Sequence, residues 1–323
     1  MDDGSLIRSF EFAAGSPGPR LDLFVAASLA IARKQAGRLV QAGKVTVNGR
    51  RIKKGAELQP GDRVEVDVSP AAPGGPAPGE AAGAEPSLPI RVVHEDADLV
   101  VVDKPAGVHS AALAPGDTDT VAGFLVRRYP EMARFGFSPL DAGLVHRLDR
   151  DTSGLLLAAR SAHAFERLRR QFEERTIGKT YLALVQGHPP RRGLLDRPIQ
   201  RKGRRGRRVY VVGPGERPDG RDVLAAVTRF RLKEPIGDFA LLEVSPETGV
   251  MHQIRAHLAA AGYPVVGDAL YGVSSDGGAP PATRHLLHAW KLSFAHPGTG
   301  GRTHLVSPLP DDFHRVLDRL REG

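Results

Sequence analysis

The sequence predicts an α+β protein, with a small α/β unit near the N-terminus and a larger unit built on a mostly antiparallel, mixed sheet. Three observations support this prediction. The chain has 323 residues, which is enough for two domains. A segment rich in proline, alanine and glycine interrupts it at residues 69–89. After that segment, short apolar runs of strand length alternate with amphipathic stretches of helical spacing.

The small unit is expected to span residues 20–68, after an N-terminal tail over residues 1–19. Apolar residues between Leu21 and Leu29 indicate a short amphipathic helix. Residues 33–43 indicate a second helix, because a glycine at its end is a common stop signal.

A hairpin and a final strand complete the small unit. Asn48-Gly49 lies between two β-prone runs, which is a strong hairpin signal. A Pro-Gly-Asp turn at residues 60–62 precedes an alternating strand over residues 64–68. The segment 69–89 that follows has too few large apolar residues to fold, so we interpret it as a linker.

The larger unit is expected to span residues 90–323 and to mix strands with helices. Apolar runs predict strands at residues 90–94, 99–102, 181–185, 223–231 and 239–244. Helical spacing predicts helices at residues 120–128, 162–175 and 252–261.

The charge of the chain favours a polyanionic partner, either nucleic acid or an anionic membrane. The formal net charge is +8 and the sequence pI is about 10.0. The segment Arg191–Arg208 alone holds nine basic residues and one acidic residue, a net charge of +8.

Several classes of protein are disfavoured by composition. There is no cysteine, so we expect neither disulfides nor thiolate metal sites. The N-terminus is acidic and no apolar core follows it, which argues against a signal peptide. No apolar run approaches the roughly 20 residues that a membrane span requires. We therefore expect a cytoplasmic protein that does not associate with membranes.

The most informative segment is His146–Gly154, in which charged and hydroxylic side chains crowd together directly before an apolar run. The apolar run predicts a buried strand. The polar segment would then lie on a loop at the mouth of that strand, where a rigid scaffold can hold catalytic groups.

This segment resembles the signature of the RluA-type RNA pseudouridine synthases, His-Arg-Leu-Asp-x-x-Thr-Ser-Gly, at every fixed position. Further matches follow in the order that the family has them, and together they span residues 90–308. They are Leu99–Gly107, Lys179–Ala183, His252–Arg255, Gly267–Gly272 and Leu287–Ala289.

The resemblance implies the pseudouridine synthase catalytic fold and the conversion of uridine in RNA to pseudouridine. This reaction breaks the bond between uracil and ribose and rejoins the ring through carbon, and it requires neither cofactor nor metal. The family's aspartate corresponds to Asp149, which would act on the ribose as a nucleophile or as a base. Arg255 would lie beside it and favour its charged form. Tyr181, a third catalytic residue, would lie against the uracil face and could take part in proton removal.

The resemblance also implies contacts with RNA, from which the target base must be flipped out. Arg147 would fill the vacated space or hold a phosphate, and His146 would contact RNA or brace the loop. The small unit resembles the ribosomal-protein-type RNA-binding module called the alpha-L domain. Further RNA-binding residues are expected in that unit and in the basic segment, namely Arg33, Lys34, Arg38, Lys44, Arg201, Arg204, Arg207 and Arg208.

Two positions depart from the family pattern. Val250 and Met251 stand where the family usually has Arg-Thr, so one cation and one hydroxyl are missing near the expected site. Asp103 stands where the family usually has asparagine.

We expect a monomer that acts on large-subunit ribosomal RNA, and transfer RNA is the alternative substrate. A catalytically idle RNA-binding or ribosome-assembly protein is a second alternative, which the Val250-Met251 departure favours. A metal hydrolase is a third, but the twelve histidines include no His-Glu-x-x-His pattern.

Overall fold

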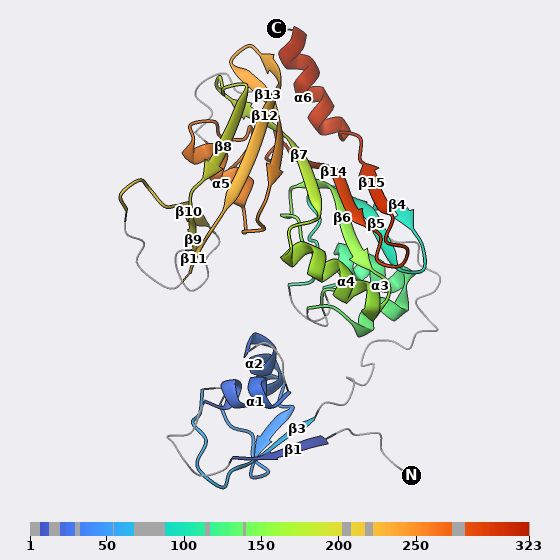
Figure 1. Ribbon diagram of the computed structural model, residues 1–323, viewed down its shortest axis with the longest axis vertical. Helices are drawn as coiled ribbons and strands as arrows, with labels where there is room; N and C mark the ends of the chain where they lie inside the picture. The colour runs from blue at the N-terminus through green and yellow to red at the C-terminus, as the bar shows by residue number, and fades with distance from the viewer. Residues whose placement is uncertain are drawn as a thin grey trace. The chain divides into compact units, whose positions relative to one another are not determined.

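The computed structural model describes residues 7–12, 20–29, 33–53, 55–67, 88–113, 117–137, 140–201, 208–216, 222–272 and 282–322. The chain divides into two compact units, residues 1–83 and 84–323. Each unit is described by itself (Figure 1). Most of the expected linker, residues 69–89, lies outside the described residues.

The first unit is a three-stranded antiparallel sheet with two helices. Its elements are β1 (Ile7–Glu11), α1 (Leu21–Leu29), α2 (Arg33–Gln41), β2 (Val45–Val47) and β3 (Arg63–Asp67). The strand order is β1-β3-β2. Leu21 and Val25 of α1 and Val64 and Val66 of β3 are fully buried and share one apolar core. The expected helices and the strand at 64–68 are confirmed.

Two predictions for this unit need correction. The tail predicted over residues 1–19 includes β1, which pairs with β3 along its whole length. The hairpin prediction is right about the turn, because Asn48 and Gly49 both have positive φ (51° and 73°). It is wrong about the second strand. After the turn only Arg50 bridges back to Val47, and β2 takes β3 as its partner.

The second unit is organised around a nine-stranded mixed sheet. Its strand order is β4-β5-β6-β14-β7-β13-β12-β8, and β15 also pairs with β14. Only the β6–β14 pair is parallel, so the prediction of a mostly antiparallel sheet is confirmed. These strands are β4 (Arg91–Glu95), β5 (Leu99–Lys104), β6 (Ser153–Ala159), β7 (Gly178–Gln186), β8 (Arg192–Asp196), β12 (Val227–Ile236), β13 (Phe239–Pro246), β14 (Leu287–Ala295) and β15 (Arg302–Val306).

Helices cover both faces of this sheet. Their bounds are α3 (Val121–Arg128), the 3-10 helix η1 (Pro130–Arg134), α4 (Ala162–Glu173), α5 (Gln253–Ala260) and α6 (Asp311–Glu322). One core joins Val100 and Val102 of β5 to α3 and α5, and another joins Leu99 and Val101 of the same strand to α4. Because alternate residues of a strand point to opposite faces, the central strands are buried on both sides. Helix α6 packs on Leu182 and Leu184 at the other end of the sheet (Figure 1).

A small second sheet lies beside α5. It consists of β9 (Ile199–Arg201), β10 (Val209–Val211) and β11 (Val223–Leu224), in the order β10-β9-β11. The strand predicted over residues 223–231 is therefore two strands in two sheets, with a break before β12. The helices predicted at 120–128, 162–175 and 252–261 are confirmed within two residues at each end. Among the described residues, no helix is both long enough and apolar enough to span a membrane.

Candidate active site

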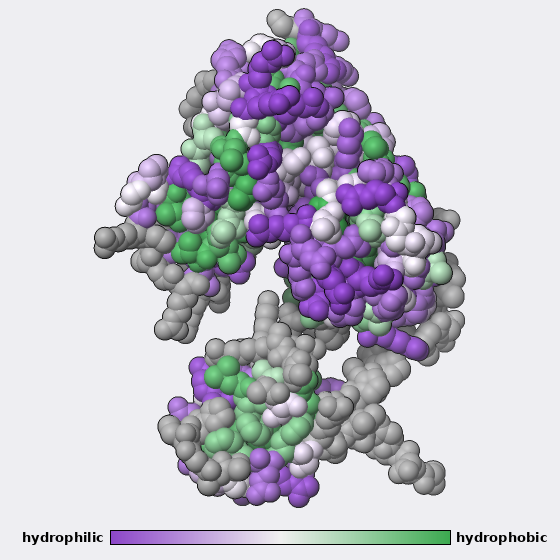
Figure 2. Space-filling model, viewed as in Figure 1, coloured by the Kyte–Doolittle hydropathy of each residue, from purple (hydrophilic) through white to green (hydrophobic). Residues whose placement is uncertain are grey.

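A cleft of about 1110 Å³ opens in the second unit, and the loop that carries Asp149 forms part of its wall. The loop before β6, the start of α5, the end of α4 with the segment that follows it, and strand β7 itself all contribute lining residues. The part of the surface over α4 is mostly hydrophilic (Figure 2). A cleft of this size is larger than one nucleoside needs, so it can accept neighbouring nucleotides as well.

The Asp149 loop is fixed by the segment that follows β5. The buried ammonium group of Lys104 donates to the carbonyls of Arg150 (2.7 Å), Val108 (2.8 Å) and Pro105 (2.9 Å). Ser110 Oγ donates to the Leu148 carbonyl and accepts from its N–H. Burial lowers the pKa of Lys104 to about 7. These contacts hold both neighbours of Asp149 in place.

The far side of the loop is fixed by residues that precede and begin β14. Thr152 Oγ1 lies 2.8 Å from His285 Nε2, and Ser153 Oγ lies 3.0 Å from His288 Nδ1. Gly154 has φ 109°, and a Cβ there would come within 2.3 Å of the Ala289 carbonyl oxygen. A glycine is therefore required where β6 begins its parallel pairing with β14.

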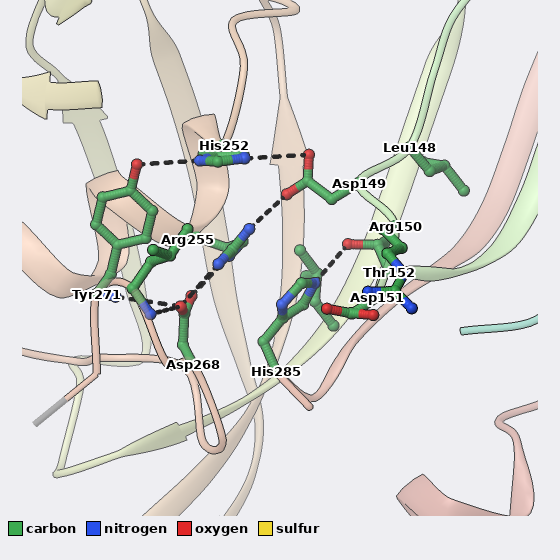
Figure 3. Close-up of polar contacts among 12 residues, drawn as sticks. Leu148, Asp149, Arg150, Asp151, Thr152, His252, Arg255, Asp268, Tyr271 and His285 are labelled. Carbon is green, nitrogen blue, oxygen red and sulfur yellow. Dashed lines mark hydrogen bonds and ion pairs between the residues drawn. The ribbon is translucent and has the colours of Figure 1, made fainter. Parts of the chain in front are cut away.

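Arg255, on α5, joins Asp149 to a second carboxylate. Its Nη1 donates to Asp149 Oδ2 (2.8 Å), while Nε and Nη2 donate to the two oxygens of Asp268 (2.7 and 2.8 Å) (Figure 3). The Asp268 carboxylate raises the pKa of Arg255, and the guanidinium in turn lowers the pKa of Asp268 against the effect of burial. The expected neighbourhood of Asp149 and Arg255 is present in the structure.

His252 and Tyr271 complete the wall next to Asp149. His252 Nε2 lies 3.9 Å from Asp149 Oδ1, and His252 Nδ1 lies 3.1 Å from the Tyr271 hydroxyl (Figure 3). Burial lowers the pKa of His252, which keeps the ring neutral at pH 7. Asp268, Tyr271 and His252 all lie in segments that resemble family motifs, Gly267–Gly272 and His252–Arg255, but the resemblance implied no role for these three residues.

Tyr181, on β7, lines the same cleft and is 9% exposed. Burial and the charge of Asp149 raise its pKa well above the usual value for a phenol. The phenol therefore stays protonated at neutral pH. This favours a role in packing against the uracil ring over a role as an ionised general base.

The residues expected to contact RNA near the loop differ in their surroundings. His146 Nε2 accepts from the Leu157 N–H (3.0 Å), and its ring lies 5.1 Å from the ring of Phe172, so it braces the loop. Arg147 is exposed in the cleft and forms no hydrogen bond or ion pair with any described residue. Arg147 is thus available for a ligand.

The other expected RNA-binding residues are distributed over both units. Arg201 lines the cleft, and the Arg208 guanidinium lies 5.1 Å from the centre of the Tyr271 ring. Arg204 and Arg207 lie outside the described residues. In the first unit Lys44 Nζ lies 3.7 Å from Asp67. Helix α2 carries the remaining three basic residues, whose side chains are outside the described part: Arg33, Lys34 and Arg38.

The departures from the family pattern have structural partners. Val250 and Met251 pack on an apolar cluster that joins α5 to the small sheet. Asp103 Oδ2 accepts from both Arg91 Nη2 and Ser307 Oγ, each at 2.7 Å. Apolar packing of Val250 and Met251 thus replaces the missing cation and hydroxyl, and the ion pair with Arg91 accounts for the Asp103 carboxylate.

One group of described side chains has metal-ligand spacing, and it does not line the cleft. His94 Nε2 and His296 Nε2 lie 2.8 and 2.9 Å from Asp96 Oδ2. His296 Nδ1 accepts two backbone N–H groups, from Gly298 and Thr299 (both 3.1 Å), which places the ring proton on Nε2. His296 therefore donates to Asp96, and the group joins two turns by hydrogen bonds.

Comparisons with known proteins agree with this geometry. A family profile described as RNA pseudouridylate synthase matches residues 98–260, and an S4 domain profile matches residues 19–64. An uncharacterized RNA pseudouridine synthase of Chloroflexus aurantiacus is 42% identical over 94% of this chain and 90% of its own length. The ribosomal large subunit pseudouridine synthase D of Xanthomonas campestris is 35% identical over 90% of this chain and 85% of its own length.

A solved structure shares the architecture of the second unit. Human RNA pseudouridylate synthase domain containing 4 is 27% identical, with a TM-score of 0.56, over 72% of this chain and 93% of that one. The matched profiles cover Asp149, Tyr181 and Arg255 in the cleft and most of the small N-terminal unit. The chain belongs to the RNA pseudouridylate synthase family, the isomerases that convert uridine in RNA to pseudouridine.

Proposed function

We propose that this enzyme modifies specific uridines of large-subunit ribosomal RNA and that Asp149 is its catalytic carboxylate. The assignment of Asp149 rests on the different surroundings of its two carboxylate oxygens. Arg255 binds Oδ2, whereas Oδ1 accepts no hydrogen bond from any described residue, and Asp149 lines the cleft. A carboxylate that is held at one oxygen and open at the other can meet a ribose in a fixed orientation.

Each remaining residue has a part in this proposal. Oδ1 of Asp149 either attacks C1′ of the flipped nucleoside or removes a proton from its ribose, and the C1′–N1 bond then breaks. Tyr181 packs against the uracil ring, and Arg147 occupies the space that the flipped base leaves. Arg201 and Arg208 bind phosphates, and the S4 unit adds affinity with Lys44 and the basic residues of α2.

The large-subunit assignment is supported by what related proteins are called. Relatives named ribosomal large subunit pseudouridine synthase D occur in Nitrosomonas europaea and Xanthomonas campestris, at 37% and 35% identity. The relative at 42% identity is named only as an RNA pseudouridine synthase, with no particular RNA specified. Transfer RNA is therefore the second substrate to test.

The experiment compares purified wild-type enzyme with Asp149→Asn and, as a matched control in the same loop, Asp151→Asn. Each protein is incubated with large-subunit ribosomal RNA and with transfer RNA transcripts, and pseudouridine is mapped chemically. Asp149→Asn is expected to lose turnover while its RNA affinity stays within a few fold, and Asp151→Asn is expected to stay active. Removing residues 1–83 should weaken RNA binding. Turnover by Asp149→Asn would refute the role of the carboxylate, and modification of transfer RNA alone would refute the ribosomal assignment.

A further inference from the structure

The open oxygen of Asp149 faces a second polar group across a gap of defined width. Asp149 Oδ1 and His252 Nε2 are 3.9 Å apart, which is too long for a hydrogen bond between them. A substrate atom beside the line that joins them can lie about 3 Å from both, as a reacting atom must lie relative to a catalytic group and a stabilising donor. Figure 3 shows the imidazole edge directed at the carboxylate.

The contacts around His252 favour the tautomer with its proton on Nε2, beside the Asp149 carboxylate. The Tyr271 hydroxyl accepts from the Val209 N–H at 2.9 Å, so its own proton is available to donate to His252 Nδ1. Because Nδ1 is the acceptor, the proton of the neutral ring is on Nε2. The group that faces Asp149 is therefore an N–H donor.

The backbone conformation of His252 is unusual, and it also directs the N–H donor toward Asp149. His252 has φ 55° and ψ 17°, the left-handed region that residues other than glycine seldom adopt. This conformation immediately precedes α5 and turns the ring toward Asp149. Such conformations persist where the surroundings enforce them, often at active sites. The Tyr271 hydroxyl holds the His252 ring at 3.1 Å, and the guanidinium groups of Arg208 and Arg255 lie 5.1 and 5.4 Å from the centre of the Tyr271 ring.

We propose that His252 is a further catalytic residue, whose Nε2–H donates a hydrogen bond to a uracil carbonyl oxygen as the ring leaves the ribose. The proposal rests on the proposed role of Asp149. When the C1′–N1 bond breaks, its electron pair stays on the uracil ring and spreads onto the carbonyl oxygens. A donor that is already oriented stabilises this charge without reorganisation.

The step is balanced without any change in His252. The electron pair on the ring forms the new C5–C1′ bond as the bond between C1′ and Asp149 breaks or, if Asp149 acted as a base, as the abstracted proton returns to the ribose. The proton on C5 is then lost, and N1 takes up a proton. His252 only donates a hydrogen bond, so it ends the cycle neutral and ready for the next turnover.

The test measures kcat and KM for an RNA substrate with His252→Asn and His252→Gln. Asparagine tolerates the left-handed backbone but is too short to reach the gap, whereas glutamine offers an N–H at nearly the distance of Nε2. We expect His252→Asn to lower kcat by about 100-fold or more with KM within about threefold, which is the loss typical of removing one such donor. His252→Gln should recover about tenfold of that loss.

Matched controls make the outcomes distinct. His257→Gln alters a buried histidine within α5 that bonds to Thr228 and Arg197 and does not line the cleft, so its kcat should stay near the wild-type value. A kcat for His252→Asn near wild type, a change in KM alone, or no recovery by glutamine would overturn the proposal. If Asp149→Asn is inactive while His252→Asn is not, only the role of His252 fails. If Asp149→Asn retains turnover, the proposed role of Asp149 fails, and the role of His252 that rests on it fails too.

Discussion

Arg255 serves two carboxylates, and at the scale of single residues the two differ in burial. The Asp268 side chain is fully buried, forms a two-point contact with Arg255 and accepts from the N–H groups of Leu270 and Tyr271. The Asp149 side chain is 24% exposed and forms one contact. Asp268 therefore fixes the position of the Arg255 guanidinium, and Asp149 binds its remaining nitrogen, Nη1.

This difference in burial predicts that substituting Asp268 destabilises the fold much more than substituting Asp149. Asp268→Asn should lower the free energy of unfolding by about 3–5 kcal/mol, because it leaves a buried guanidinium without its counter-charge. Asp149→Asn should cost less than about 1 kcal/mol, because its site opens to solvent. Urea denaturation of both variants measures these values. Equal losses would show that Asp149 is as structural as Asp268.

The sequence allowed the Asp149–Arg255 pair to be anticipated only through a resemblance. The two residues are 106 positions apart, and no local pattern specifies their contact. The roles of Asp268, Tyr271 and His252 were not anticipated, since each depends on partners from other segments. The Gly267–Gly272 match was a usable signal, because an aspartate after a positive-φ glycine can cap the following turn with its carboxylate.

At the scale of elements, helix α6 is tied to the Asp149 loop by Arg284. Arg284 makes a two-point ion pair with Asp312 in the first turn of α6, at 2.6 and 3.0 Å. Its Nη1 also donates to the carbonyl of Asp151 (3.0 Å), two residues after Asp149. The position of the loop therefore depends in part on where the C-terminal helix is anchored.

The same helix supplies a control for this dependence. Near its other end, Arg321 makes a two-point ion pair with Glu234 of β12, at 2.9 and 2.7 Å, and neither residue lines the cleft. Asp312→Asn should lower kcat by about tenfold or more, because small displacements of a catalytic group are costly. Glu234→Gln should leave kcat unchanged. Steady-state kinetics of both variants tests this prediction. Equal losses of kcat would mean that α6 affects activity only through the stability of the fold.

Helix α6 and strands β14 and β15 were not predicted, although part of their pattern was readable. The sequence Asp311–Glu322 is amphipathic, with acidic residues in its first turn and arginines in its last. Strand β14 was noted only as a motif, because its alternation is interrupted by an irregularity in its pairing with β7 between Ala289 and Lys291, where its other edge passes from β6 to β15. Pairing between β6 and β14 joins segments more than 130 residues apart, which periodicity cannot reveal.

At the scale of the whole molecule, every histidine lies in the second unit. All twelve fall between His94 and His314, so the first unit contains none. Burial lowers the pKa of five of them, to about 3 for His146 and to about 4 for His285. The others shifted downward are His252, His257 and His288. Acid should therefore affect the two units differently.

The direction of the effect follows from linkage. An unfolded histidine takes up a proton near pH 6.5, whereas these folded histidines stay neutral to lower pH. Their contribution to stability is complete above pH 6.5 and is lost as the pH falls, for His285 down to about 4. The free energy of unfolding of the second unit should fall by about 1.4 kcal/mol per pH unit for each such histidine.

Urea denaturation of the full chain between pH 7.5 and 4.5 measures this loss, with the transition of the first unit as an internal control. His285→Gln can keep the contact with Thr152 Oγ1 but cannot titrate, so its stability should decline less steeply, by about 1.4 kcal/mol per pH unit. A parallel decline in both units would point to general acid effects instead. A second unit whose stability stayed constant down to pH 4.5 would mean that its buried histidines titrate as they do in the unfolded chain.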